Sequence, residues 1–332
     1  MKDTKTEEKL RLFANLILDR VSEMTPEERE QLDKKIIKEK STQPKAFLVK
    51  AFTKDKTQGN PAGVVLNADY LTDKQMQYIA KELGFSESAF VSKSDNADYK
   101  VRFFSQTQEV DFCGHATIAA FHTLVEQVEL YQLYIGDKTK ESVVVTQETK
   151  AGILPVICYK NGLVVMTQND PKFFEPEKDK NRIAQLLGID PKHILGYPLQ
   201  TVSTGTPKLI ISIDSLDTLF AMTPDLESIK TYCKETGAKG FYPFTTETKE
   251  KDSDFHARQF NPISGIDEDP ITGVAAGALG CYILKHKLSK KKNFVIEQGY
   301  AMNKAGKIFV DVKKEVKVGG YAVTFGTKTF HL

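Results

Sequence analysis

Residues 113–124, CGHATIAAFHTL, place a cysteine, a glycine and a histidine at the predicted start of a helix of small residues. The first N–H groups of a helix have no partner within the helix, and the helix dipole is positive at this end, so an anion is stabilised there. Cys113, Gly114 and His115 are therefore candidates to face a substrate carboxylate or enolate. A structural interpretation is also open, with Gly114 in a tight turn and His115 hydrogen-bonded in the core.

A second candidate is Glu87 in the segment GFSESAFV. The two-residue period of a strand places Glu87 on one face with Phe85, Ala89 and Val91. A carboxylate on an apolar face is costly unless it is paired, and such carboxylates are suited to acid–base catalysis. The alternative is a glutamate at the end of a strand that reaches solvent.

The helix start at Gly114 has a counterpart later in the chain. The segment VRFFSQTQEVDFCGHATIAAFHTL, from Val101, aligns without gaps on ARQFNPISGIDEDPITGVAAGALG, from Ala257, at a fixed offset of 156 residues. An Arg-x-Phe unit and an Ala-Ala pair coincide. Further upstream the offset falls to 146, where GNPAGVVL meets GTPKLIIS. We predict two similar α/β halves, each with one small-residue helix that neighbouring backbone approaches closely.

If the two halves face one another, both helix starts border one cleft that suits a small carboxylate. The second start contains Asp269 and Pro270, followed by Thr272 and Gly273. Asp269 is predicted either to contact the substrate or to act as N-cap of this helix, with Pro270 at its first position.

The surrounding sequence supplies elements that can hold these residues. Residues 46–52 and 62–66 are predicted strands, and residues 72–84 form a predicted helix with Thr72 as N-cap, Gln75 completing a capping box and Gly84 ending it. Residues 1–45 differ, because apolar residues at helical spacing on both sides of MTPEERE predict a helical hairpin. The hairpin docks on its own chain or a sister subunit, or it forms a dedicated partner site.

The set GNPAGVV, GFSESAFV, VDFCGHATIAA, EDPITGVAAGAL and VGGYAV resembles, in order and spacing, the phenazine-biosynthesis (PhzF-like) isomerase family over roughly residues 46–325. The resemblance implies a diaminopimelate epimerase-like α+β fold, in which two pseudo-symmetric lobes each wrap a barrel-like sheet around a central helix. The expected organisation is an N-terminal extension over 1–45, a first lobe over 46–168 and a second lobe over 169–332. It also implies a site between the lobes without metal or cofactor.

The resemblance assigns roles to individual residues. Glu87 matches the proton-shuttling glutamate of the family, His115 the histidine after the helix-start glycine, and Asp269 the aspartate of the D-P-x-T-G motif. The backbone N–H groups of Gly114, Thr272 and Gly273 are implied to bind the anionic part of the substrate. Cys113 and Asn60 complete the expected substrate-binding set.

Two positions depart from the phenazine enzymes. Val274 stands where those enzymes have a serine after T-G, so one polar contact to substrate is missing. Cys113 matches instead the first catalytic cysteine of the epimerases, whereas Asp269 occupies the place of the second. We predict a cofactor-independent isomerase that moves a proton on a small carboxylate-bearing metabolite. The alternatives are an epimerase that uses Cys113, and a catalytically silent small-molecule-binding module.

Composition limits the partners. The 46 basic and 44 acidic residues are scattered and leave a net charge of +2, which does not favour nucleic acid or an anionic membrane as partner. Four cysteines without C-x-x-C spacing, and no apolar segment like a signal peptide or membrane span, predict a cytoplasmic protein. Dinucleotide, triphosphate and HExxH zinc motifs are absent, and Cys113 with His115 lacks further spaced metal ligands. A homodimer is expected from the family alone.

Overall fold

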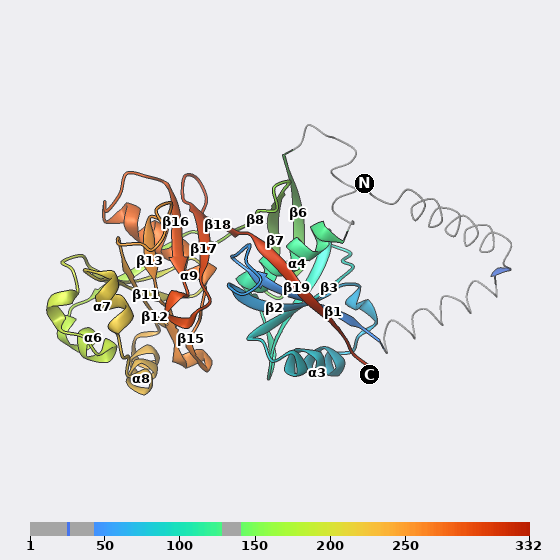
Figure 1. Cartoon of the computed structure of the whole chain (residues 1–332), viewed down its shortest axis with the longest axis horizontal. Coiled ribbons are helices and arrows are strands. Elements are labelled where there is room, and N and C mark those ends of the chain that lie inside the picture. The colour runs from blue at the N-terminus through green and yellow to red at the C-terminus, as the bar shows by residue number, and fades with distance from the viewer. Residues whose placement is uncertain (1–24, 27–42, 128–140) are drawn as a thin grey trace.

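The computed structural model describes residues 25–26, 43–127 and 141–332, and these residues form two lobes side by side (Figure 1). The predicted helical hairpin of residues 1–45 lies almost entirely outside the described residues. Among the residues that are described, no helix has the length and apolar character needed to cross a membrane.

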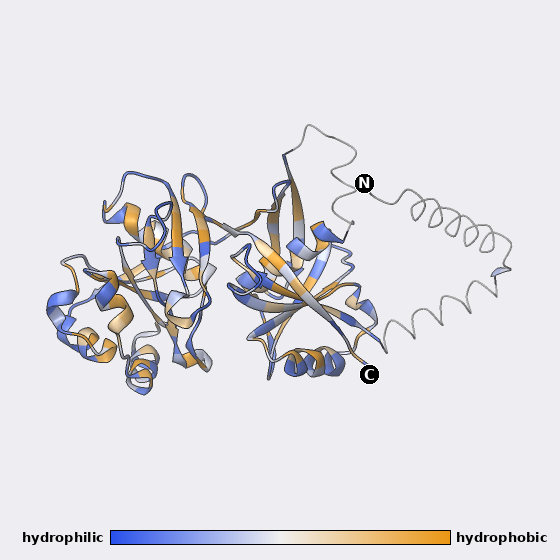
Figure 2. Cartoon of the chain, in the orientation of Figure 1, coloured by the Kyte–Doolittle hydropathy of each residue, from blue (hydrophilic) through white to orange (hydrophobic). Residues whose placement is uncertain are grey.

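The first lobe is built around helix α4, whose residues from His115 to Leu124 are all buried. Helix α3 lies outside the sheet and shows the predicted caps, with the Thr72–Gln75 capping box at its start and Gly84 in the left-handed conformation at its end. In Figure 2, α3 alternates hydrophilic and hydrophobic bands, as expected for a surface helix that buries one face. The elements are β1 (Lys45–Ala51), β2 (Asn60–Val65), η1 (Ala68–Tyr70), α3 (Asp73–Leu83), β3 (Glu87–Ser92), β4 (Tyr99–Ser105), β5 (Glu109–Val110), α4 (Gly114–Glu126), β6 (Ser142–Thr149), β7 (Gly152–Tyr159) and β8 (Val164–Thr167).

The second lobe surrounds the buried helix α9 in the same way. Its strands are β9 (Lys172–Glu177), β10 (Leu199–Ser203), β11 (Lys208–Ser212), β12 (Phe241–Thr245), β13 (Phe255–Ala257), β14 (Phe260–Asn261), β15 (Ile266–Glu268), β16 (Asn293–Gln298), β17 (Gly306–Asp311) and β18 (Lys317–Gly320). Its helices are α6 (Lys180–Leu187), α7 (Leu216–Ala221), α8 (Leu226–Thr236) and α9 (Gly273–Lys285), with short 3-10 turns η2 (Pro191–His193), η3 (Pro262–Ser264) and η4 (Tyr300–Met302).

Strand pairing confirms the predicted internal repeat. The strands of the first lobe are paired in the order β1-β2-β3-β4-β6-β7-β8, and those of the second in the order β10-β11-β12-β13-β16-β17-β18; the pairing of β8 with β18 joins the two sets into one 19-stranded sheet. In each, the second and third strands are parallel, the fourth and fifth are parallel, and the other neighbours are antiparallel. Two lobes of one topology, each wrapped around a small-residue helix, are the fold that the sequence predicts.

Side chains repeat with the topology. Arg102 forms a two-pronged hydrogen bond with Glu109 and its guanidinium lies over the ring of Phe104. Arg258 does the same with Glu268 and Phe260 in the second lobe. The fixed offset of 156 residues matches the arginines and the phenylalanines, but it misses the glutamates, because the strand that carries them is displaced in the second lobe.

The chain crosses between the lobes more than once. Strand β19 (Ala322–Thr329) pairs with β1 and covers an edge of the first sheet, as β9 covers the edge of β10 in the second. Strand β8 pairs with β18. The expected second lobe of residues 169–332 is therefore corrected at its end, because the last strand satisfies the backbone groups that β1 would otherwise leave unpaired at a sheet edge.

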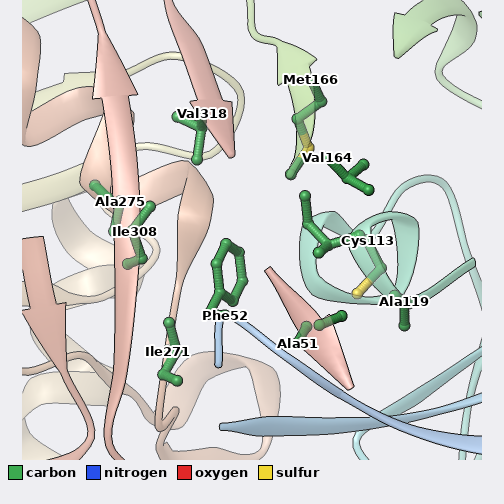
Figure 3. Packing of buried hydrophobic residues seen from close by; sticks show 14 of the residues in the cluster. Ala51, Phe52, Cys113, Ala119, Val164, Met166, Ile271, Ala275, Ile308 and Val318 are labelled. Atoms are coloured by element: carbon green, nitrogen blue, oxygen red, sulfur yellow. The ribbon is translucent and has the colours of Figure 1, made fainter. Parts of the chain in front are cut away.

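The core is continuous between the lobes, and Phe52 lies in the middle of it. Figure 3 shows the Phe52 ring between Cys113 of the first lobe and Ile271 of the second lobe. Phe52 has a left-handed φ of 66°, which is unusual for a bulky residue. Glycine at positions 273 and 320 makes room for the ring, since a β-carbon there would lie 3.2 and 2.4 Å from its atoms.

Candidate active site between the lobes

A cleft of about 770 Å³ opens between the lobes and contains both predicted helix starts. Glu87, Cys113, Gly114 and His115 line it from the first lobe, and Lys208, Asp269, Thr272 and Gly273 line it from the second. The structure therefore brings together seven of the eight residues that the sequence singles out, and Asn60 lies behind the wall. A volume of this size accommodates a small metabolite.

Glu87, His115 and Cys113 form one cluster on the first wall. The His115 Nε2 atom is 3.6 Å from Glu87 Oε2 and 3.4 Å from Ser86 Oγ, while its Nδ1 atom is 3.4 Å from Cys113 Sγ. Glu87 begins β3, and His115 lies in the first turn of α4, so a strand end and a helix start hold the pair. The imidazole is thus positioned to orient the carboxylate at the edge of the cleft.

The Cys113 thiol is protonated at neutral pH. Burial raises the pKa of Cys113 well above its usual value, and the nearby charge of Glu87 raises it further. The ligand atoms of Glu87, Cys113 and His115 lie within 4.8 Å of one another, and this donor set is one that zinc binds. Zinc binds the thiolate form of cysteine, so metal binding at this cluster would release the Cys113 proton.

Asp269 stands on the second wall in a network that reaches across the lobes. Its Oδ1 atom accepts a hydrogen bond of 3.0 Å from Asn60 Nδ2, and its Oδ2 atom accepts one from the Thr272 hydroxyl. Although Asp269 keeps some surface open to the cleft, the protein around it is dense, and this burial raises its pKa above the usual value. A carboxyl group shifted toward its protonated form can donate a hydrogen bond to a substrate oxygen.

Asp269 does not cap helix α9. The ungapped repeat places Pro270 opposite Gly114, yet α9 begins at Gly273, with Thr272 as its N-cap residue. Asp269 lies before the helix because its carboxylate is bound by Asn60 and Thr272. The predicted N-cap with Pro270 at the first helical position is therefore wrong.

The two helix starts differ in what they offer to an anion. The Thr272 N–H donates to Gln298 Oε1 at 3.2 Å, so it already has an acceptor within the protein. No acceptor for the N–H groups of Gly114 and Gly273 occurs among the hydrogen bonds of the described residues. Gly114 and Gly273 remain available to a ligand, whereas the Thr272 hydroxyl acts by orienting Asp269.

Asn60 lies behind the cleft wall and is only 1 % exposed. Its amide nitrogen donates to Asp269 Oδ1 and also, at 3.0 Å, to the carbonyl of Ile271. The expectation that Asn60 binds substrate directly is corrected by this position, because its side chain holds Asp269 instead of facing the cleft. Asn60 is thus a positioning residue.

Two polar residues of the site are missing from the sequence prediction. Gln298 ends β16, and it links Thr272 to Asp269 by accepting from the Thr272 N–H and donating to the Asp269 carbonyl at 2.8 Å. Lys208 begins β11 and lines the cleft. The repeat could have drawn attention to Lys208, because the offset of 146 residues aligns this lysine with the apolar Ala62 of the first half. A charged residue at a position that is apolar in the other half indicates a difference in function.

Comparisons with known proteins place this architecture among isomerases. The family described as phenazine biosynthesis-like protein matches residues 49–328. An uncharacterized isomerase of Clostridium acetobutylicum is 40 % identical over 296 residues, which cover 83 % of this chain and 94 % of the relative.

Solved structures agree with the sequence match. The phenazine biosynthesis protein of the PhzF family from Bacillus anthracis has a TM-score of 0.78 at 30 % identity and covers 87 % of this chain and 99 % of its own. A hydroxyproline epimerase from Agrobacterium vitis shares the fold alone, with a TM-score of 0.57 at 13 % identity over 88 % of this chain and 93 % of its own.

Proposed function

The chain belongs to the phenazine biosynthesis-like protein family, and from this premise we propose that it is a cofactor-independent isomerase that moves a proton on a small carboxylate-bearing metabolite. The observation that carries the proposal is the Glu87 carboxylate, 3.6 Å from His115 Nε2, at the edge of a cleft whose opposite wall contains Asp269. The isomerase names of the relatives support the reaction class.

In the proposed reaction, Glu87 accepts a proton from a carbon next to a carbonyl or enol group. The electron pair of the broken C–H bond moves into the conjugated system and forms an enolate. Protonated Glu87 then returns the proton to a different carbon of the same system, so the double bond shifts and the product has the composition of the substrate. One carboxyl group can serve as base and then as acid because both steps occur at one position.

The other residues stabilise the enolate and hold the substrate. Asp269, whose pKa is raised by burial, donates a hydrogen bond to the oxygen on which negative charge develops. His115 orients Glu87 from the first turn of α4. The N–H groups of Gly114 and Gly273 bind the anionic part of the substrate at the positive ends of two helices.

The decisive experiment compares wild-type protein with Glu87→Gln during turnover in deuterium oxide, with a substrate found by screening small carboxylates. We expect loss of activity by at least about 100-fold and loss of deuterium incorporation, because the amide keeps the shape but neither accepts nor returns a proton. Binding of the substrate should persist. Glu82→Gln, an exposed change on α3, is the matched control and should leave turnover unchanged. An active Glu87→Gln protein would refute the mechanism.

Two alternatives give different outcomes in the same experiment. An epimerase that uses Cys113 as acid or base would lose activity on replacement of that thiol. A silent binding module would be stabilised by a carboxylate ligand and would show no turnover in wild-type protein. We also propose a homodimer, from family resemblance, which light scattering tests. A cytoplasmic location is proposed because four cysteines without C-x-x-C spacing suit a reducing compartment.

A further inference from the structure

Lys208 is a buried cation on the second wall of the cleft. Its residue is 2 % exposed, although it lines the space between the lobes. An ammonium group has three N–H donors, and here one donates at 2.8 Å to the backbone carbonyl of Lys239. Among the described residues, the Lys208 ammonium makes no other hydrogen bond and forms no ion pair with a carboxylate. Burying a charge with so few partners is costly, so we expect an anionic ligand to bind next to the ammonium.

The surroundings of Lys208 indicate where that anion binds. The charge of Asp269 raises the pKa of Lys208, but the two side chains do not form an ion pair. The turn before β11 lies against the start of α9, since Thr204 Oγ1 donates to the Val274 carbonyl at 3.2 Å. Lys208 and the Gly273 N–H therefore belong to the same wall. Val274, where the phenazine enzymes have a serine, supplies no polar side-chain atom to this wall.

The repeat shows that this feature is restricted to one lobe. At the offset of 146 residues the counterpart of Lys208 is Ala62, which is fully buried and apolar. The first wall instead contains Glu87, a negatively charged group when it acts as a base. A substrate with one carboxylate therefore meets an asymmetric cleft, with the fixed cation on one wall and the proton-accepting carboxylate on the other.

We propose that Lys208 binds the carboxylate of the substrate at the second wall and thereby directs the reacting carbon toward Glu87. The inference rests on the proposed isomerase function and names the residue that selects an anionic substrate and sets its orientation. The ammonium is cationic at neutral pH, since burial lowers the pKa of Lys208 only to about 8. A charge-assisted hydrogen bond in an enclosed site favours the carboxylate over a neutral isostere.

The test uses two probes of nearly equal shape, benzoate and benzamide, with the full chain at pH 7 and constant ionic strength. Calorimetric titration should show that the wild-type protein binds benzoate at least about tenfold more tightly than benzamide, as expected for one charge-assisted contact. Lys208→Met and Lys208→Gln should both lose this preference and keep the affinity for benzamide. Lys192→Met removes the same charge from an exposed side chain of the second lobe and should keep it.

Two variants are used because one of them could fail to fold, and circular dichroism identifies a folded variant. A folded Lys208 variant that keeps the preference for benzoate overturns the proposal, and so does wild-type protein without such a preference. Neither probe undergoes turnover. Failure here would therefore leave proton transfer by Glu87 standing, whereas an active Glu87→Gln protein would refute the isomerase mechanism without affecting benzoate binding.

Discussion

The side-chain amide of Asn60 in the first lobe donates a hydrogen bond to Asp269 in the second lobe, with 3.0 Å between Nδ2 and Oδ1. The same nitrogen donates to the Ile271 carbonyl, so one buried amide fixes the segment that precedes helix α9. The two lobes are thus joined at the residue proposed to stabilise the enolate. Relative movement of the lobes would displace Asp269 from the substrate.

Replacement of Asn60 by alanine should therefore lower kcat more than it raises KM. The change removes two hydrogen bonds and leaves buried acceptors without donors, which we expect to cost about 1–3 kcal/mol in the free energy of unfolding. Steady-state kinetics and urea denaturation of the same preparations measure both effects. A normal kcat in a destabilised Asn60→Ala protein would show that Asn60 supports the fold and does not position Asp269.

An alanine at Gly277 should destabilise the protein, because the Gln168 side chain, which bonds Thr204 and the Gly273 carbonyl, would have to move. A β-carbon at Gly277 would lie 2.0 Å from Gln168 Oε1, a group that accepts a hydrogen bond from Thr204. We expect Gly277→Ala to destabilise the protein by about 1–3 kcal/mol, as overpacking does. Gly196→Ala is the matched control, since nothing lies within 4 Å of its added carbon. Equal melting temperatures for the two variants would contradict the packing argument.

The sequence predicts the structure best where the information is local or repeated. The caps of α3 follow from Thr72, Gln75 and Gly84 alone, because a helix end is determined by a few neighbouring residues. The twofold topology follows from the repeat. The choice of Glu87 and His115 depends on the family resemblance, because the strand pattern and the helix start each leave a structural interpretation open, and their role in catalysis stays a prediction.

Long-range relationships could not be predicted in the same way. Asn60 and Asp269 are 209 residues apart, and nothing in the local sequence indicates which groups the Asn60 amide contacts. The ungapped repeat misplaces the N-cap of α9, because it does not account for the extra turn of chain that carries Asp269. A lysine is normally exposed, and the burial of Lys208 depends on strands that are distant in sequence and pack around it.

Lys208 should make stability depend on pH at alkaline values. Burial lowers its pKa from 10.5 to about 8, so between these values the unfolded chain binds a proton that the folded protein has lost, and stability rises with pH. Below pH 8 both states are charged, and the full cost of burial, roughly 3 kcal/mol, is present. Lys208→Met should therefore be more stable than wild type at pH 7, with the difference shrinking toward pH 10.5.

Denaturation of both proteins at several pH values measures this difference. Asp269 and Cys233 interact electrostatically with Lys208, and Lys208→Met also removes this interaction from their own titrations. A difference in stability that stays constant between pH 7 and pH 10.5 would mean that Lys208 has an ordinary pKa. Stability that falls for both proteins is compatible with the argument, because only the difference between them reports on Lys208.

Val274→Ser should not confer activity on a dihydro-hydroxyanthranilate, the type of substrate that the phenazine resemblance implies. The change restores one hydroxyl at the start of α9, but substrate specificity depends on the shape and polarity of the whole cleft, including Lys208. Product analysis by mass spectrometry with the variant and with wild-type protein would decide. Turnover that appears only in the serine variant would show that this one hydroxyl separates the chain from the phenazine enzymes.

Cys113 distinguishes the two possible kinds of proton transfer. Under the proposed mechanism the thiol packs beside His115 as a small apolar group, because its raised pKa keeps it protonated. Cys113→Ala should then retain activity within about threefold of wild type, the size of effect expected from a small packing change. Under the epimerase mechanism the same change removes the acid or base, and activity should fall by more than about 100-fold.

A second buried cysteine provides the control for packing. Cys158 lies in β7 and is fully buried, but it does not line the cleft, so Cys158→Ala removes a thiol from the same lobe without touching the site. If Cys113→Ala and Cys158→Ala lose similar stability and both keep turnover, the thiol has no chemical function, which agrees with Glu87 as the proton carrier on the first wall. If only Cys113→Ala is inactive while Glu87→Gln keeps activity, the acid–base group is the thiol, and Glu87 supports it through His115.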